Sequence, residues 1–96
     1  MKGNIVSTSG SLGRSPKVTI YTTPHCHWCR VAKRHFSENA IRFTEIDVSR
    51  SGPGRREMIL MTGSMAVPVI RVGEHAMSGW DEAEFRMLVS GRFKQR

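Results

Sequence analysis

Two cysteines separated by two residues are the most chemically informative feature of the chain. Cys26 and Cys29 lie in the stretch Thr-Thr-Pro-His-Cys-His-Trp-Cys, residues 22–29. No other cysteine occurs among the 96 residues. This spacing lets the two sulfurs meet across one helical turn and form a reducible disulfide. Such a bond closes so short a loop that it would be a poor structural crosslink. The pair is therefore typical of redox chemistry.

The position of the pair predicts different roles for the two cysteines. A β-prone run precedes the pair and an apolar stripe of helical spacing follows it, which places Cys26 at a helix N-terminus. Free backbone N–H groups and the helix dipole favour a thiolate there. The basic or titratable residues around it in sequence, with no acid among them, are His25, His27, Arg30 and Lys33. We therefore predict that Cys26 is the attacking nucleophile and that Cys29, one turn inside the helix, is the more buried resolving thiol.

The elements that must position this pair follow the order β-α-β-α-β-β-α. Hydrophobic spacing and turn residues predict strands over residues 18–21, 41–48, 67–72 and 76–78, and helices from residue 26 or 27 to 40, over 55–62 with Pro53 in the first turn, and over 81–91. Residues 58–61 are expected to face the core, and Asp81 to cap the last helix. The first half is a right-handed parallel βαβ unit and the last two strands form a hairpin. The fold class is thus α/β, with a four-stranded mixed sheet flanked by three helices.

Length and composition predict one small folded domain. The chain has 96 residues, of which 39% are hydrophobic, and no apolar run approaches the roughly 20 residues of a membrane helix. Residues 1–16 are rich in Ser, Gly and Thr, which predicts a disordered leader or residues added for expression. The domain is expected over 17–91, followed by a basic tail at 92–96. We expect a cytoplasmic monomer without a membrane partner.

The basic charge of the chain does not indicate a nucleic-acid partner. The formal net charge is +7, but residues 17–90 contain ten basic and eight acidic residues, so most of the excess lies toward the ends. Modules that bind nucleic acid usually gather their charge on one face and interleave aromatic residues with it. The sequence shows no such interleaving, and we expect no nucleic-acid binding.

Three motifs in order carry a resemblance to a known family. They are Tyr-Thr-Thr-Pro-His-Cys-His-Trp-Cys at 21–29, Ala-Val-Pro at 66–68, and Ser-Gly-Trp-Asp-Glu at 78–82. The second matches Thr-Val-Pro with Ala for Thr, and the third resembles Gly-Gly-x-Asp-Asp with Ser for the first Gly. Over about residues 17–90 the chain resembles the glutaredoxins of the thioredoxin superfamily. The resemblance implies a thioredoxin-like fold and an oxidoreductase that reduces protein disulfides or glutathione mixed disulfides.

The resemblance also implies a glutathione-binding site. A cis bond between Val67 and Pro68 would face the active site and leave the Val67 backbone free to pair with a bound peptide or glutathione. The loop at 79–81 would hold the γ-glutamyl end, and Arg55 or Arg56 would bind the glycyl carboxylate. The substrate-binding residues expected are His27, Trp28, Val67, Pro68, Gly79, Trp80, Asp81 and Arg55. Glutathione is expected as a co-substrate, with no bound cofactor and no metal.

The sequence departs from the family pattern and leaves alternatives open. Typical glutaredoxins have Pro-Tyr between the cysteines, where this chain has His27 and Trp28, and many have a basic residue where Thr22 and Thr23 stand. His-Ala-Met-Ser-Gly-Trp at 75–80 resembles redoxins that thioredoxin reductase reduces, but Asp81 replaces the Arg that often follows in them. One alternative is therefore a redoxin with thioredoxin reductase as partner. A second alternative is an iron–sulfur or metal-carrier protein with Cys26 as a ligand. A third is a binding module whose disulfide only switches the shape of the protein.

Overall fold

The order of elements predicted from the sequence is confirmed. A computed structural model describes residues 16–90 of the chain, so the predicted tail and all of the predicted leader except Pro16 lie outside the described residues. The elements are β2 (Val18–Thr22), α1 (His27–Glu38), β3 (Thr44–Asp47), α2 (Gly52–Thr62), β4 (Val69–Val72), β5 (His75–Ser78) and α3 (Glu82–Ser90). None of the helices in this part of the chain is long and apolar enough to cross a membrane.

The strand order brings distant parts of the sequence to one end of the sheet. The four strands lie in the order β3-β2-β4-β5, with β3 parallel to β2 and each of the other neighbouring pairs antiparallel. Val69, at the start of β4, lies opposite Tyr21 near the end of β2 and opposite Ser78 at the end of β5. Because α1 follows β2 and α3 follows β5, both helices begin at this same end of the sheet.

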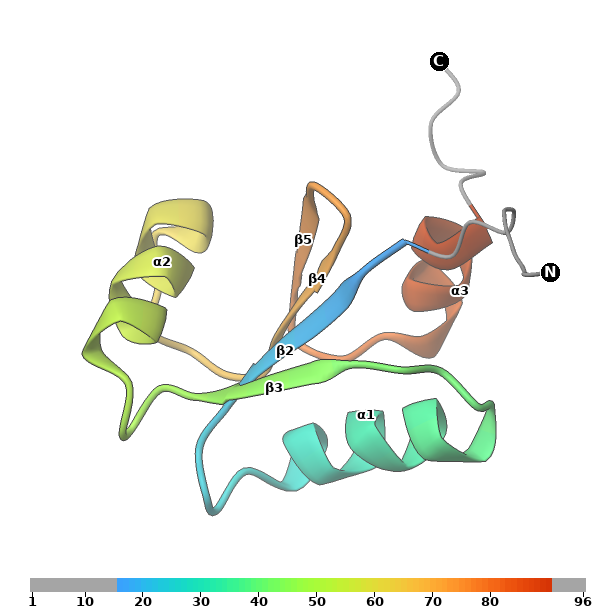
Figure 1. The fold of residues 1–96 in the computed structure, drawn as a ribbon, viewed down its shortest axis with the longest axis horizontal. Helices are drawn as coiled ribbons and strands as arrows, with labels where there is room; N and C mark the ends of the chain where they lie inside the picture. The colour runs from blue at the N-terminus through green and yellow to red at the C-terminus, as the bar shows by residue number, and fades with distance from the viewer. Residues whose placement is uncertain (1–15, 91–96) are drawn as a thin grey trace, which may run out of the picture.

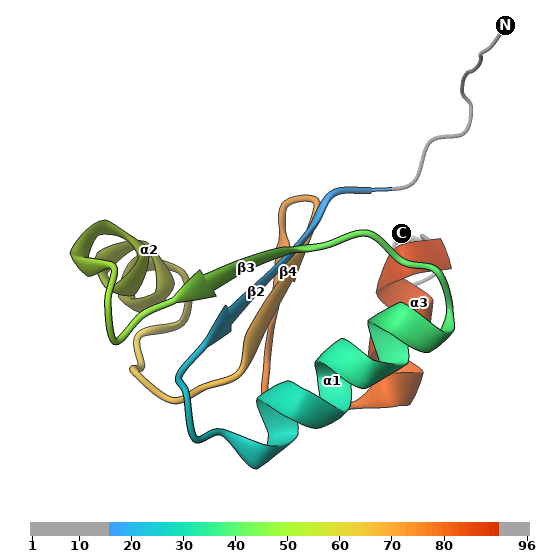
Figure 2. The ribbon, with the colours of Figure 1, turned by 60° about the horizontal axis from the view of Figure 1, so that its bottom comes forward.

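Two apolar layers hold the helices on the sheet. Figures 1 and 2 show α1 and α3 together on one face and α2 on the other. The layer under α1 and α3 is built from Val18, Ile20, Ala32, Phe36, Ile70, Val72, Met77, Phe85 and Leu88. The smaller layer under α2 contains Tyr21, Val48, Met58 and Val69. Alternate residues of the central strands supply both layers, as expected for a sheet covered on both faces.

All four strands differ from their predicted bounds, and β5 begins one residue earlier than expected, at His75. The strand expected over 41–48 is only Thr44–Asp47. Its first residues are not in the sheet because the Ile41 N–H donates to the Phe36 carbonyl, 2.8 Å away, which holds the chain at the end of α1. The strand expected to begin at Val67 begins at Val69, since Pro68 has no N–H to give to a ladder. The first strand, predicted over residues 18–21, extends by one residue to Thr22, which pairs with Asp47.

The helices also differ from expectation. The first ends at Glu38 and Ala40 adopts a φ of +56° outside it. The second begins at Gly52, because the Ser51 hydroxyl accepts a hydrogen bond from the Gly54 N–H at 2.9 Å and caps it. The expectation that residues 58–61 all face the core is wrong: Met58 is buried, but Leu60 is 87% exposed. Four successive helical residues span most of a full turn and cannot share one face.

Candidate active site

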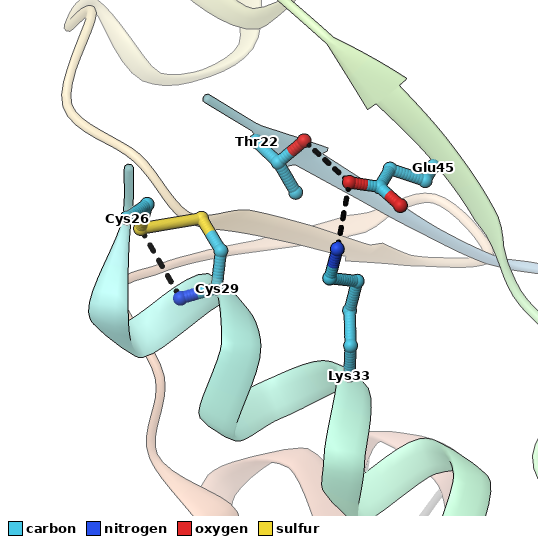
Figure 3. The surroundings of a disulfide bond; sticks show 5 residues. All are labelled: Thr22, Cys26, Cys29, Lys33 and Glu45. Atoms are coloured by element: carbon cyan, nitrogen blue, oxygen red, sulfur yellow. Dashed lines mark hydrogen bonds and ion pairs between the residues drawn. A yellow bond between two sulfur atoms is a disulfide. The ribbon is translucent and has the colours of Figure 1, made fainter. Parts of the chain in front are cut away.

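A disulfide joins Cys26 to Cys29 where β2 hands over to α1. Cys26 is the N-cap of α1 and is half-buried, whereas Cys29, in the first turn, is 1% exposed. Their Cα atoms are 5.2 Å apart, within the usual range for a disulfide. Figure 3 shows the bond at the start of the helix. The predicted asymmetry between an accessible and a buried sulfur is present in the structure.

The start of α1 is built to stabilise negative charge on Cys26. The backbone N–H of Cys29 donates to the Cys26 Sγ atom at 3.1 Å. The first turn of α1 carries no acidic residue, so nothing there opposes the positive end of the helix dipole. A thiolate at this position would accept the same hydrogen bond with the added strength of a charged acceptor.

A polar network lies beside the disulfide, between α1 and the strands β2 and β3 (Figure 3). Glu45 Oε2 accepts hydrogen bonds from the Thr22 hydroxyl at 2.8 Å and from Lys33 Nζ at 2.9 Å. Burial alone would raise the pKa of the Glu45 carboxyl, but the hydrogen bonds from Lys33 and Thr22 outweigh it and lower that pKa. Glu45 is therefore a carboxylate at neutral pH, and it neutralises a lysine that we had counted among the positive surroundings of Cys26.

Sequence reasoning missed this network for a physical reason. Thr22, Lys33 and Glu45 belong to three different elements, β2, α1 and β3. The parallel register, which places Ile20 opposite Glu45, decides which strand residue meets the helix. A signal was nonetheless present. Glu45 lies between Phe43 and Ile46, which pack against core layers on opposite faces of the sheet. Lys33 follows Cys29 by four residues, on the same helical face.

The Ala-Val-Pro and Ser-Gly-Trp-Asp-Glu motifs meet at the same end of the sheet. The bond between Val67 and Pro68 is cis, as the resemblance implied. The Gly79 N–H donates to the Pro68 carbonyl at 2.8 Å and joins the two motifs. Gly79 has a φ of +81°, a conformation that favours glycine. Val67 is half-buried and lies beyond the last pair of the ladder between β2 and β4, which is Tyr21 with Val69.

Trp80 and Asp81 both anchor the start of α3. The Trp80 ring packs against the rings of His35, Phe36 and Phe85, with centroids 5.2, 5.7 and 5.4 Å away. Asp81 caps α3 as predicted, because its carboxylate accepts a hydrogen bond from the Glu84 N–H at 3.1 Å. Both residues thus have structural contacts, and their roles in substrate binding stay predictions.

The remaining predicted binding residues lie in two separate places, at the start of α1 and on α2. His27 and Trp28 are exposed in the first turn of α1, with ring centroids 5.0 Å apart, beside the cysteines. Arg55 lies on α2, and its guanidinium donates to the Val48 carbonyl at 3.2 Å, beyond the end of β3. The structure therefore groups His27 and Trp28 with the disulfide, whereas Arg55 is held at the end of the neighbouring strand. Within residues 16–90, no three His, Cys, Asp or Glu side chains cluster to hold a metal ion.

A redox disulfide between a strand and a helix, on a four-stranded mixed sheet with helices on both faces, defines a redox protein of the thioredoxin-like class. Comparison with known proteins narrows this class. The family model for glutaredoxin matches residues 18–77, well over half of the chain. The chain belongs to the glutaredoxin family.

Relatives of two kinds are similar to this chain. The glutaredoxin-like protein NrdH of Lactococcus lactis subsp. cremoris is 34% identical over 71 residues, which cover 74% of this chain and 97% of the relative. A glutaredoxin of Pseudomonas aeruginosa is 36% identical over 67 residues, which cover 70% of this chain and 80% of the relative. The structure of NrdH-redoxin from Escherichia coli matches with a TM-score of 0.62 at 29% identity, covering 74% of this chain and 93% of that one.

Proposed function

We propose that this protein is a thiol–disulfide oxidoreductase that reduces protein disulfides and glutathione mixed disulfides, with Cys26 as nucleophile and glutathione as the electron donor. The observation that carries the proposal is the unequal burial of the two sulfurs at the start of α1. Cys26 is partly accessible and accepts a backbone N–H bond, whereas Cys29 is buried. A sulfur in the first environment suits attack on an external disulfide.

The chemistry proceeds in two exchanges. The Cys26 thiolate attacks one sulfur of the substrate disulfide, a mixed disulfide forms, and the other substrate sulfur leaves as a thiolate. Cys29 then attacks Cys26 Sγ, the Cys26–Cys29 bond forms, and the second substrate thiolate leaves. Two electrons pass from the dithiol to the substrate. Two glutathione molecules restore the dithiol by the same exchange and leave as glutathione disulfide.

The geometry around the two outer motifs supports glutathione as a ligand. The Val67 backbone lies beyond the ladder, where an extended peptide can pair with it as an added strand. The start of α3, which Asp81 caps, adjoins it through the hydrogen bond from Gly79 to the Pro68 carbonyl. A helix N-terminus suits a carboxylate, and the Asp81 carboxylate suits an ammonium group, so this end of the sheet fits both groups of a γ-glutamyl moiety.

The proposal is tested by coupling the protein to glutathione reductase. NADPH consumption is followed with a glutathione mixed disulfide of a small thiol as substrate, for the wild type, Cys26→Ser and Cys29→Ser. We expect turnover in the wild type and none in Cys26→Ser. Cys29→Ser should retain turnover with this substrate, because a second glutathione can release the first from Cys26, but should lose the reduction of a protein disulfide. Activity in Cys26→Ser together with none in Cys29→Ser would reverse the roles of the two cysteines.

A second candidate is a redoxin that thioredoxin reductase reduces. It is favoured by the similarity to the E. coli NrdH-redoxin, whose structure is described as the basis of a thioredoxin-like activity profile. The same dithiol would then reduce proteins, but a reductase would restore it in place of glutathione. Replacing glutathione and its reductase with thioredoxin reductase in the assay separates the two candidates. Turnover only in that second system would select this alternative.

A further inference from the structure

The network beside the disulfide lies on the face of α1 that carries the buried sulfur. Lys33 follows Cys29 by four residues, so the two side chains leave neighbouring turns of α1 on one side. Glu45 and Thr22 come from the strands beneath. The Glu45 carboxylate accepts a hydrogen bond from the Lys33 ammonium at 2.9 Å and a second one from the Thr22 hydroxyl. Figure 3 shows the ammonium and the carboxylate on the same side of α1 as the Cys29 sulfur. Neither group has a part in the exchange described above.

The resolving step makes a demand that this network can meet. Cys29 must become a thiolate before it attacks Cys26, but its burial disfavours a charged sulfur. The nearby lysine and glutamate together carry no net charge, and their contact is one ion pair at 2.9 Å. Changing either partner therefore changes the local charge by one unit, in opposite directions.

We propose that Lys33 and Glu45 are positioning residues that set the charge beside Cys29 in the resolving step. This inference rests on the proposed function. In that step the Cys29 thiol gives its proton to solvent, and the thiolate attacks Cys26 Sγ. The Cys26–Cys29 bond forms, the bond from Cys26 to the substrate sulfur breaks, and its electron pair leaves with the substrate thiolate. The Lys33 ammonium favours the charged sulfur, and the Glu45 carboxylate limits that effect.

Among residues 16–90, three further sets of polar or charged groups bear on the pair. Asp47, further along β3, acts on Glu45 through space and opposes its ionisation. Arg30, next to Cys29 in sequence, is exposed on α1, and from β2 the nearest contributor is the uncharged Thr22 hydroxyl. His25 and His27 flank Cys26 at the start of the helix and are common to every variant considered below.

The test observes the resolving step directly. Reduced protein in excess is mixed with 5,5′-dithiobis(2-nitrobenzoate). Attack by Cys26 releases one coloured thiolate, and attack by Cys29 on the mixed disulfide releases the second. The rate of the second phase against pH reports the ionisation of Cys29. Cys29→Ser should show the first phase alone, which identifies the two phases.

The variants should move the midpoint of that pH profile in opposite directions. Glu45→Gln leaves the Lys33 charge unopposed, so the midpoint falls; Lys33→Gln leaves the carboxylate unopposed, so it rises. For charges about one helical turn apart near the surface, we expect shifts that change the rate below the midpoint by about 3- to 10-fold. Lys33→Arg keeps the charge and should match the wild type. The double variant Lys33→Gln/Glu45→Gln is again neutral and should return close to it.

An ion pair on the opposite face of the sheet provides the matched control. Arg71 and Glu57 are 3.6 Å apart with side chains 38% and 48% exposed, against 31% and 38% for Lys33 and Glu45. Glu57→Gln should leave the midpoint unchanged. Equal shifts of one sign in both single variants, or shifts no larger than that of Glu57→Gln, would overturn the inference. Absence of the second phase in the wild type would instead contradict the proposed function.

Discussion

The two tryptophans near the active site offer a sharp comparison, because their surroundings differ. Trp28 is 55% exposed, and its one ring contact among the described residues is with His27. Trp80 is partly buried and packs against three rings and the core layer under α1 and α3. Replacing each with alanine should therefore separate a contribution to substrate binding from a contribution to stability.

The expected magnitudes follow from these contacts. Truncating a fully buried aromatic residue costs about 3–5 kcal/mol, and each aromatic pair adds about 0.5–1.5 kcal/mol beyond burial. For Trp80→Ala, where the residue is only partly buried, we expect the free energy of unfolding to fall by about 2–3 kcal/mol. For Trp28→Ala the loss should stay below about 1 kcal/mol. In the coupled assay, however, Trp28→Ala should lower kcat/KM, because its ring is available to substrate beside Cys26.

The assay is urea unfolding of the oxidised proteins, followed by far-ultraviolet circular dichroism so that the lost tryptophan does not alter the signal. The linear extrapolation gives the free energy of unfolding. The kinetic measurement is made at a temperature where all three proteins are fully folded. If Trp28→Ala destabilised the fold as much as Trp80→Ala, the contrast in packing drawn from the structure would be refuted.

Two further predictions concern the face of the sheet under α2. A Cβ atom on Gly54 would lie 2.5 Å from Ile46 Cγ2, whereas a Cβ atom on Gly52 would meet nothing closer than 3.5 Å. Gly54→Ala should therefore lower the free energy of unfolding in urea by about 1–3 kcal/mol. Gly52→Ala should change that free energy by less than about 0.5 kcal/mol. Burial, followed by the hydrogen bond to Glu57, raises the pKa of the Tyr21 hydroxyl above its ordinary 10.0. The protonated Tyr21 hydroxyl therefore stabilises the fold fully below its ordinary pKa, and this stabilisation declines as the pH rises above it. When urea unfolding is measured from pH 9 upward, the free energy of unfolding of the wild type should fall toward that of Tyr21→Phe. A difference between the two proteins that stays constant with pH would contradict this prediction.

The sequence predicts features that depend on local residue patterns. The seven elements, the helix start at Cys26 and the cap at Asp81 follow from short-range spacing, and the structure has all of them. The cis bond at Pro68 was available only through the resemblance, because most X-Pro bonds are trans. The earlier start of α2 depends on the Ser51 cap. The sequence alone does not decide this start, because the stretch Ser-Gly-Pro-Gly at residues 51–54 fits a turn as well as the beginning of a helix.

Features that depend on tertiary register were not predictable in the same way. Whether Glu45 meets α1 or α2 is decided by its alternation within β3, and a shift of one residue in register would reverse it. The orientation of α2 likewise decides that Leu60 is exposed and Met58 buried. Each choice is settled by packing between elements that are distant in the chain, whereas the local pattern of apolar residues fits more than one arrangement.

The period of α1 explains how one helix gives two identical residues unequal chemistry. Cys26 occupies the cap, where its sulfur accepts a backbone N–H bond and remains accessible. Three residues later, close to one turn, Cys29 turns inward and is buried. Lys33 then follows on the inner side and meets Glu45, whereas Trp28 stays exposed. A change of one residue in the spacing between the cysteines would place the second sulfur on another side of the helix, away from both Cys26 and the network, so the spacing and the partly exposed ion pair belong to one arrangement.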